Sequence, residues 1–301
     1  MCNNCPKQRK VLAYLIAFFV AFIAFSMLFA PAKKPAIVKP TICVSTFPLY
    51  EVARTLAGDT FEVKPIVPLG SDAHAYSPSP ADVASISKAA LFVYSGAGFE
   101  AWAQPLKNTL PTSVKVIDMS QHVELLNNDP HYWLNIDNMI AMTETMEVEF
   151  SKLSPKNKEL YHTNALTYMV ELKKLKSEYS AGLAQCKSRT LITNHDAFGY
   201  LAHANNLKNI SIIGLSSDEQ PSAKTMANII SLVQKEKIGT IFFEELIDDN
   251  VAQTIAKESG ARAQPLQPLE NISEVELKLQ STYLSIMRDN LRKMREAMEC
   301  R

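Results

Sequence analysis

Residues 155–183 read PKNKELYHTNALTYMVELKKLKSEYSAGL, and they decide the fold because they predict one long helix in the middle of the chain. Apolar residues recur there at spacings of three and four, with Lys and Glu between them, as on an amphipathic helix: Leu160, Leu166, Met169, Val170, Leu172, Leu175 and Tyr179. At 1.5 Å per residue, such a helix is on the order of 40 Å long. That length suits a strut that joins two lobes.

Short apolar runs typical of strands alternate with helical patterns on both sides of this helix. Before it, strands are predicted at 41–47, 61–67, 90–95 and 114–117, and helices at 49–56 and from Pro80, with Ser79 as the N-cap. After it, strands are predicted at 190–193, 210–215 and 240–243, and helices at 197–204, 223–235, 251–259 and 273–298. The alternation predicts an α/β protein with a mostly parallel sheet and surrounding helices in each of two lobes.

The boundaries follow from these patterns. We expect an N-terminal lobe over 41–154, the linking helix over 155–185 and a C-terminal lobe over 186–301, with a linker rich in Lys, Ala and Pro at 33–40.

Residues 1–32 have the features of an export segment. Basic residues precede an apolar run from Val11 to Ala30 that contains no charge, and the small-residue sequence Ala30-Pro31-Ala32 follows. The run approaches the roughly 20 residues that span a bilayer, so a cleaved signal peptide and an uncleaved N-terminal signal anchor are both open. Either places the body of the protein outside the cytoplasm, with membrane contact if the segment is retained. Since no Cys closes the run, lipid attachment is not expected.

The charge balance bears on partners. Lys plus Arg and Asp plus Glu each number 31, so the formal net charge is zero. A neutral chain without a basic run provides no field that attracts nucleic acid, and we exclude that class of partner.

Three cysteines lie in the exported part: Cys43, Cys186 and Cys300. An oxidising compartment permits one disulfide among them, but the sequence does not choose between the pairings or exclude three free thiols. They are too few and too far apart for a thiolate zinc site.

Three of the six histidines are expected where a strand has just ended: His74, His131 and His195. Ligand sites in open α/β sheets form outside the carboxyl ends of the strands, so the three would converge at the cleft between the lobes. Three imidazoles with one further group satisfy a tetrahedral Zn²⁺ ion. The spacing of about 60 residues forms no local chelating motif, so the pattern alone is weak.

The other histidines are assigned plainer roles. His162 is expected on a solvated helix face, His203 is expected to pack within its helix, and His122 is not expected to bind metal. Enzyme motifs such as GxSxG, the P-loop and HExxH are absent, so no catalytic residue is assigned. Glu244, which follows a strand, is expected to orient a histidine from outside the metal shell or to cap a helix.

Several motifs in order resemble the zinc and manganese solute-binding proteins of ABC transporters, the ZnuA/TroA-like group. The resemblance extends from about Cys43 to Asn290, and its supports include Ser45-Thr46-Phe47-Pro48, Gly70-Ser71-Asp72-Ala73-His74, Asp129-Pro130-His131-Tyr132-Trp133 and Asn194-His195-Asp196-Ala197-Phe198-Gly199-Tyr200. It implies two α/β lobes joined by a rigid helix, with a metal bound between them and delivered to a membrane permease that an ATPase powers. It also implies that the metal ligands are His74, His131 and His195.

The resemblance leaves the fourth ligand open. Many relatives carry a ligating Asp where Gln267 stands, so the fourth position is assigned to Gln267, to nearby Glu270 or to water. The segment before Asp129 lacks the loop rich in His and acidic residues that many zinc-binding members have.

Three imidazoles favour Zn²⁺, as the transported ligand, over Mn²⁺. The leading hypothesis is therefore a non-catalytic, monomeric zinc-binding protein located in the periplasm or on the extracytoplasmic face of the inner membrane. The alternatives are a manganese- or iron-binding member of the same class, an adhesin-type surface protein and a zinc hydrolase.

Overall fold

The computed structural model describes residues 15–19, 39–127, 129–215, 221–244, 246 and 249–301. Residues 15–19 are helical, and the described residues from Lys39 onward form one compact unit. The predicted signal segment 1–32 and linker 33–40 lie almost wholly outside the described residues. In the part of the chain that is described, no helix combines the length and apolar character needed to cross a membrane.

The first sheet contains four parallel strands in the order β2-β1-β3-β4. They are β1 (Thr41–Val44), β2 (Glu62–Pro65), β3 (Leu91–Tyr94) and β4 (Lys115–Asp118), and the helices α2 (Phe47–Ala57), α3 (Pro80–Ile86) and α4 (Ala103–Lys107) lie between them in the chain. All four residues of β3 are buried, as expected for a parallel strand covered on both faces. Ser79 caps α3 through a reciprocal capping box with Asp82, as predicted.

The second sheet repeats this topology with the order β6-β5-β7-β8, again parallel. Its strands are β5 (Thr190–Thr193), β6 (Lys208–Ser211), β7 (Thr240–Phe243) and β8 (Arg262–Pro265), and its helices are α7 (Gly199–Ala204), α8 (Ala223–Glu236) and α9 (Asn250–Ser259). In each sheet the order of the strands reverses at one point, between β1 and β3 in the first sheet and between β5 and β7 in the second. Such switch points are where α/β sheets bind ligands, because adjacent loops diverge there.

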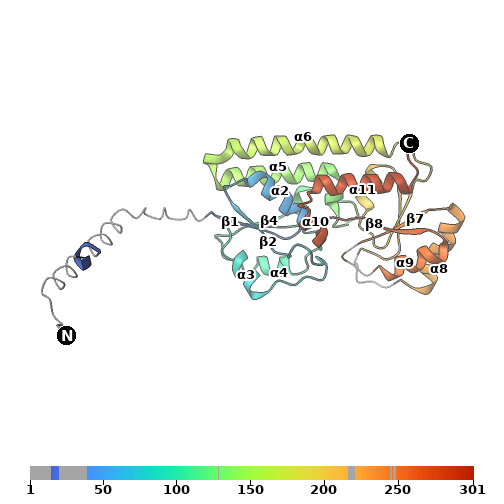
Figure 1. Cartoon of the computed structure of the whole chain (residues 1–301), viewed down its shortest axis with the longest axis horizontal. Coiled ribbons are helices and arrows are strands. Elements are labelled where there is room, and N and C mark those ends of the chain that lie inside the picture. Colours follow the sequence, from blue (N-terminus) through green and yellow to red (C-terminus); the bar gives the residue numbers. More distant parts are fainter. Residues whose placement is uncertain (1–14, 20–38, 128, 216–220, 245, 247–248) are drawn as a thin grey trace, which may run out of the picture. The chain divides into compact units, whose positions relative to one another are not determined.

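Long helices run alongside both sheets (Figure 1). The segment between the sheets folds as α5 (Ile136–Leu153) and α6 (Lys158–Gly182). The 3₁₀ turns η1 (Met119–His122) and η2 (Tyr132–Leu134) precede α5, and η3 (Pro155–Asn157) separates α5 from α6. α6 packs against both α5 and α11 (Tyr283–Ala297), and the short α10 (Glu274–Lys278) precedes α11. This arrangement confirms the predicted fold class of two parallel α/β lobes with one long helix between them. The boundaries of the lobes stay a proposal.

Two helical features differ from the sequence prediction. α5 was not predicted, although its buried Met139, Met142, Met146 and Phe150 recur at helical spacing. The single helix expected over 273–298 is instead divided into α10 and α11. The division occurs because Thr282 caps α11 through a box with Ser285, which starts a new helix.

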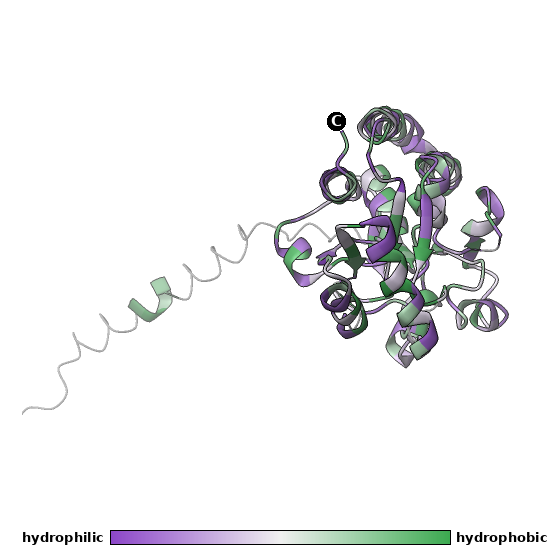
Figure 2. Ribbon diagram, turned by 90° about the vertical axis from the view of Figure 1, so that its right-hand side faces the viewer, coloured by the Kyte–Doolittle hydropathy of each residue, from purple (hydrophilic) through white to green (hydrophobic). Residues whose placement is uncertain are grey.

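One continuous hydrophobic core joins the two sheets to the long helices. It includes Val44 of β1, Met142 of α5, Leu172 of α6, Leu191 of β5 and Met287 of α11, all of them buried. Figure 2 looks at the molecule from one end and shows the central strands surrounded by helices that carry hydrophilic segments. A buried hydrogen bond of 2.7 Å from the Tyr179 hydroxyl to the Met287 carbonyl also joins α6 to α11. The sheets are therefore held by shared helices.

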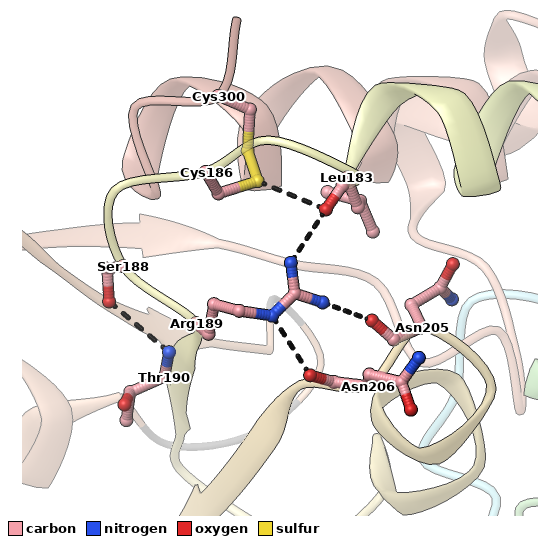
Figure 3. Close-up of a disulfide and its surroundings, with 8 residues drawn as sticks. All are labelled: Leu183, Cys186, Ser188, Arg189, Thr190, Asn205, Asn206 and Cys300. Atoms are coloured by element: carbon pink, nitrogen blue, oxygen red, sulfur yellow. Dashed lines mark hydrogen bonds between the residues drawn. A yellow bond between two sulfur atoms is a disulfide. The ribbon is translucent and has the colours of Figure 1, made fainter.

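The disulfide that the sequence left open joins Cys186 to Cys300, and Cys43 is a buried free thiol. The bond links the turn after α6 to the end of the chain after α11 (Figure 3). Beside it, the Arg189 guanidinium donates hydrogen bonds to the backbone carbonyls of Leu183, Asn205 and Asn206. Burial raises the pKa of the Cys43 thiol to about 11, so it stays protonated and unreactive.

Removal of this cross-link tests its contribution to stability. The cysteines are separated by 114 residues, so the bond restricts a large loop of the unfolded chain. Replacing both Cys186 and Cys300 by Ser is expected to lower the free energy of unfolding by about 2–4 kcal/mol, measured by urea denaturation. Cys43→Ala is the control, because it removes a buried thiol without removing a cross-link. Equal denaturation midpoints for the oxidised wild type and the double variant would refute the expectation.

Candidate metal centre

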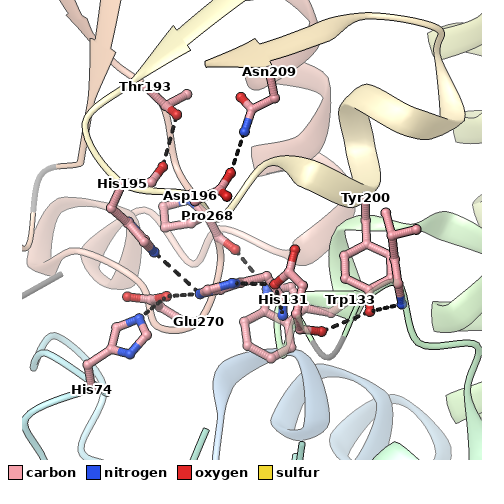
Figure 4. Close-up of polar contacts among 12 residues, drawn as sticks. His74, His131, Trp133, Thr193, His195, Asp196, Tyr200, Asn209, Pro268 and Glu270 are labelled. Carbon is pink, nitrogen blue, oxygen red and sulfur yellow. Dashed lines mark hydrogen bonds and ion pairs between the residues drawn. The ribbon is translucent and has the colours of Figure 1, made fainter. Parts of the chain in front are cut away.

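Four side chains from distant parts of the chain converge at one point between the two sheets: His74, His131, His195 and Glu270. His74 lies in the loop between β2 and α3, and His131 directly precedes η2. His195 follows β5, and Glu270 follows β8. Each offers one ligand atom, and these atoms all lie within 4.8 Å of one another (Figure 4).

The contacts inside the cluster have the dimensions of a tetrahedral zinc shell. Nε2 of His74 lies 3.1 Å from Oε2 of Glu270, and Nε2 of His131 lies 3.6 Å from the same oxygen. Nε2 of His195 lies 3.3 Å from Nε2 of His131. Ligand atoms at 2.0–2.1 Å from Zn²⁺ in a tetrahedron are about 3.3 Å apart. These three separations are close to that value, and all four ligand atoms are near enough to one another to hold a single metal ion.

Buried carboxylates hold two of the imidazoles from behind. Nδ1 of His131 lies 2.8 Å from Oδ1 of Asp129, and Nδ1 of His195 is hydrogen-bonded to Oε1 of Glu244. A carboxylate on Nδ1 fixes the ring orientation and leaves Nε2 free for the metal. Glu244 thus has the geometry expected of a residue that orients a histidine, which is one of the two roles predicted for it from the sequence. Asp129 was not predicted, although its place two residues before His131 was a usable signal.

The pKa values show how strongly these groups interact. Burial would lower the pKa of His131, but hydrogen bonds to Asp129 and Glu270 outweigh it and raise the pKa to about 9. Burial would likewise raise the pKa of Glu270, but hydrogen bonds from His131 and His74 hold it well below its usual range. For His195, burial dominates and lowers the pKa to about 3. Glu270 is therefore a buried anion that favours a cation beside it.

Gln267 and Glu270, the two side chains offered for the fourth position, lie in different places. The Gln267 amide donates to Oε2 of Glu276 at 2.9 Å and accepts from the Leu269 N–H at 3.2 Å, so it is engaged outside the cluster. Only Glu270 has an oxygen among the imidazole nitrogens. The backbone between them passes through Leu269, which has a positive φ of 64° and turns the two side chains to different environments.

Aromatic rings surround the cluster and restrict water. The Phe99 ring lies 4.7 Å from the His74 ring and 5.3 Å from the Trp133 ring, measured between centroids. Trp133 is fully buried, and its Nε1–H donates to the Pro268 carbonyl at 2.8 Å. Among the four clustered side chains, His74 alone is incompletely buried, so the cluster is closest to solvent on its side.

A tyrosine from the second lobe organises the loop that carries His131. The Tyr200 hydroxyl, on α7, donates to the Asp129 carbonyl at 2.8 Å and accepts from the Leu126 N–H at 2.7 Å. Tyr200 ends the motif Asn194-His195-Asp196-Ala197-Phe198-Gly199-Tyr200, and no role was predicted for it. Both contacts reach a loop on the other side of the cluster, so Tyr200 links the two lobes beside the site.

The remaining histidines lie outside the cluster. His162 is exposed and paired with Glu147 at 2.8 Å, as expected for a solvated helix face. His203 is exposed on α7, so the prediction that it packs within its helix is wrong; its side of α7 faces solvent. His122 ends η1 and is not among the clustered groups.

A comparison with family models matches residues 42–297 to the family described as zinc-uptake complex component A, periplasmic. The zinc-binding lipoprotein AdcA of Streptococcus pneumoniae is 34% identical over 287 residues, which cover 89% of this chain and 57% of AdcA. The chain thus spans little more than half the length of that relative.

Two solved structures share the fold. The Zn(II)-bound ZnuA-like domain of AdcA from Streptococcus pneumoniae is 36% identical, with a TM-score of 0.78, and the match covers 87% of this chain and 99% of that one. The laminin-binding protein of Streptococcus agalactiae, described as bifunctional with adhesin and metal-transporting activity, is 31% identical, with a TM-score of 0.80 over 86% and 99% of the two chains.

The two parallel α/β lobes and the buried cluster of three histidines and one glutamate define a two-lobed protein with a site able to hold a metal. Because the family model covers most of the chain, the protein belongs to the ZnuA-like zinc-uptake family. This confirms the resemblance inferred from the sequence motifs.

Single substitutions distinguish the two candidates for the fourth ligand. Glu270→Ala is expected to weaken zinc binding by about 100-fold or more, since even partners outside the metal shell contribute 10- to 100-fold. Gln267→Ala is expected to stay within about threefold of wild type, because its amide contacts only protein groups. Competition titration with a zinc-sensitive dye measures both. The reverse order of effects would assign the ligand to Gln267.

The loop contact of Tyr200 provides a second test with a matched control. Tyr200→Phe removes a hydroxyl with two partners, and we expect zinc affinity to fall about tenfold as the His131 loop loosens. Tyr168→Phe removes a buried hydroxyl that has no hydrogen-bond partner, so zinc affinity should not change. Equal affinities for the two variants would show that the Tyr200 hydrogen bonds do not support the site.

Proposed function

We propose that this protein captures one Zn²⁺ ion outside the cytoplasm and delivers it to an ABC-type importer, a permease with its ATPase. The observation that carries the proposal is the convergence of His74, His131, His195 and Glu270 within 4.8 Å. Membership of the zinc-uptake family and the likeness to a Zn(II)-bound domain support zinc as the cargo. The description of that family as periplasmic supports the location.

The ligand chemistry favours zinc over manganese or iron. Three imidazole nitrogens and one carboxylate oxygen suit a tetrahedral Zn²⁺ ion, whereas Mn²⁺ prefers oxygen ligands and more of them. The cluster has nitrogen from three side chains and oxygen from one. A manganese- or iron-binding function is therefore the weaker candidate.

A hydrolase is also the weaker reading, because a catalytic zinc site keeps one position open for water. Here, four protein side chains lie close enough together to supply all four ligands, and an aromatic ring packs beside them. We therefore propose a binding protein without catalytic activity.

An adhesin role is not favoured, since AdcA and the family model are named for zinc binding and uptake. The adhesin activity in the description of the laminin-binding protein belongs to that protein.

Elemental analysis and competition test the metal assignment. The protein purified from its native compartment is expected to contain about one zinc per chain, and added Mn²⁺ should not displace it at equal concentration.

Growth tests the delivery step. A strain lacking the protein should grow poorly under zinc chelation, and growth should recover with the wild-type protein but not with His195→Ala. Recovery by Mn²⁺ rather than Zn²⁺ would contradict the proposal.

A further inference from the structure

Asn271, the residue after Glu270, has a side chain whose hydrogen-bonding capacity is fully used. It is 1% exposed, and its Nδ2 donates to the carbonyls of Pro68 at 2.8 Å and Ser71 at 2.7 Å. Its Oδ1 accepts from the N–H of Ile272 at 2.9 Å and of Gly70 at 3.4 Å. An amide has two donors and two acceptor lone pairs, so all four positions are occupied.

These bonds join two ligand-bearing segments that lie about 200 residues apart in sequence. The turn at 68–71 leads directly to His74, whose N–H is in turn held by Oδ1 of Asp72 at 2.9 Å. On the other side, the Glu270 carbonyl accepts a hydrogen bond of 3.1 Å from the N–H of Phe47, the first residue of α2. The backbones that carry His74 and Glu270 are therefore fastened to one another.

The local backbone needs such support. Gly70 has a φ of 91°, a region open to glycine, and residues 66–79 form no helix or strand. Irregular loops have no ladder of hydrogen bonds to define their position, so side-chain contacts must do so. Asn271 supplies three of its four hydrogen bonds to this one turn.

We propose that Asn271 is a positioning residue that sets the distance between His74 and Glu270 and thereby strengthens metal binding. The inference rests on the proposed zinc-binding function. It does not make Asn271 a ligand, since the side chain is satisfied entirely by backbone groups.

The test compares zinc binding by wild type, Asn271→Ala and Asn271→Asp. The Asp variant keeps the volume and the accepting oxygen but replaces the donating amide nitrogen by a second acceptor oxygen. It can therefore be measured if the Ala variant fails to fold. Both are expected to bind zinc about 10- to 100-fold more weakly, the usual loss for a group that orients a ligand. Asn164→Ala is the control, because it removes a partly buried amide hydrogen bond to the Leu56 carbonyl, and neither residue belongs to the cluster.

Two readouts separate positioning from general stability. Bound Co²⁺ should give a four-coordinate visible spectrum in wild type and an altered one in the Asn271 variants. In a His74→Ala background, Asn271→Ala should change zinc affinity by less than about threefold, because the ligand through which it acts is gone. An unchanged Co²⁺ spectrum, or an equal loss of affinity in both backgrounds, would overturn the proposal.

Hydrogen exchange in the metal-free protein tests the anchoring of the turn by Asn271 independently of zinc binding. Asn271→Ala should speed exchange at residues 68–74 and leave β5 unchanged. If wild type bound no zinc but exchange still increased in this turn, the proposed function would fail while the anchoring of the turn stood. If zinc binding were normal and exchange did not change, the role of Asn271 would be refuted.

Discussion

The buried carboxylate of Glu270 is the group on which the rest of the site depends. It is 3% exposed and lies among three imidazoles, two of which contact its Oε2. A buried charge is costly unless an opposite charge compensates it. A divalent cation at the centre of the cluster would do so, and the carboxylates of Asp129 and Glu244 are hydrogen-bonded to the imidazoles that would share it. The buried negative charge of Glu270 therefore favours the binding of a cation at this site.

The ligands are distributed unequally between the two lobes. After β8, the chain leaves the second sheet and contacts the first lobe, where Trp133 bonds to Pro268, Phe47 to Glu270, and Glu51 to the N–H of Tyr283. Glu270 is thus fixed to the same body as His74 and His131. By contrast, His195 and Glu244 directly follow β5 and β7 of the second sheet.

Much of the fold, and the place of His195 within it, could be predicted from the sequence for identifiable reasons. Parallel strands are short apolar runs, and their carboxyl ends share one edge of a sheet, so His195 could be placed there before its neighbours were known. α5 was missed even though its buried side chains recur at helical spacing. The break at Thr282 depends on a capping box inside a continuous amphipathic pattern, which periodicity alone does not show. Gln267 and Glu270 could not be separated because the left-handed turn at Leu269 has no periodic signal.

The contributions of Asn271 and Tyr200 could not be predicted, because each depends on contacts with residues distant in sequence.

The central claim is that Zn²⁺ binds to three histidines and one glutamate. The most direct test is a crystal structure of the zinc-loaded protein with anomalous scattering measured at the zinc absorption edge. We expect one anomalous peak at about 2.0–2.2 Å from Nε2 of His74, His131 and His195 and from a carboxylate oxygen of Glu270. A peak elsewhere, or an ion whose fourth ligand is water while Glu270 lies apart, would contradict it.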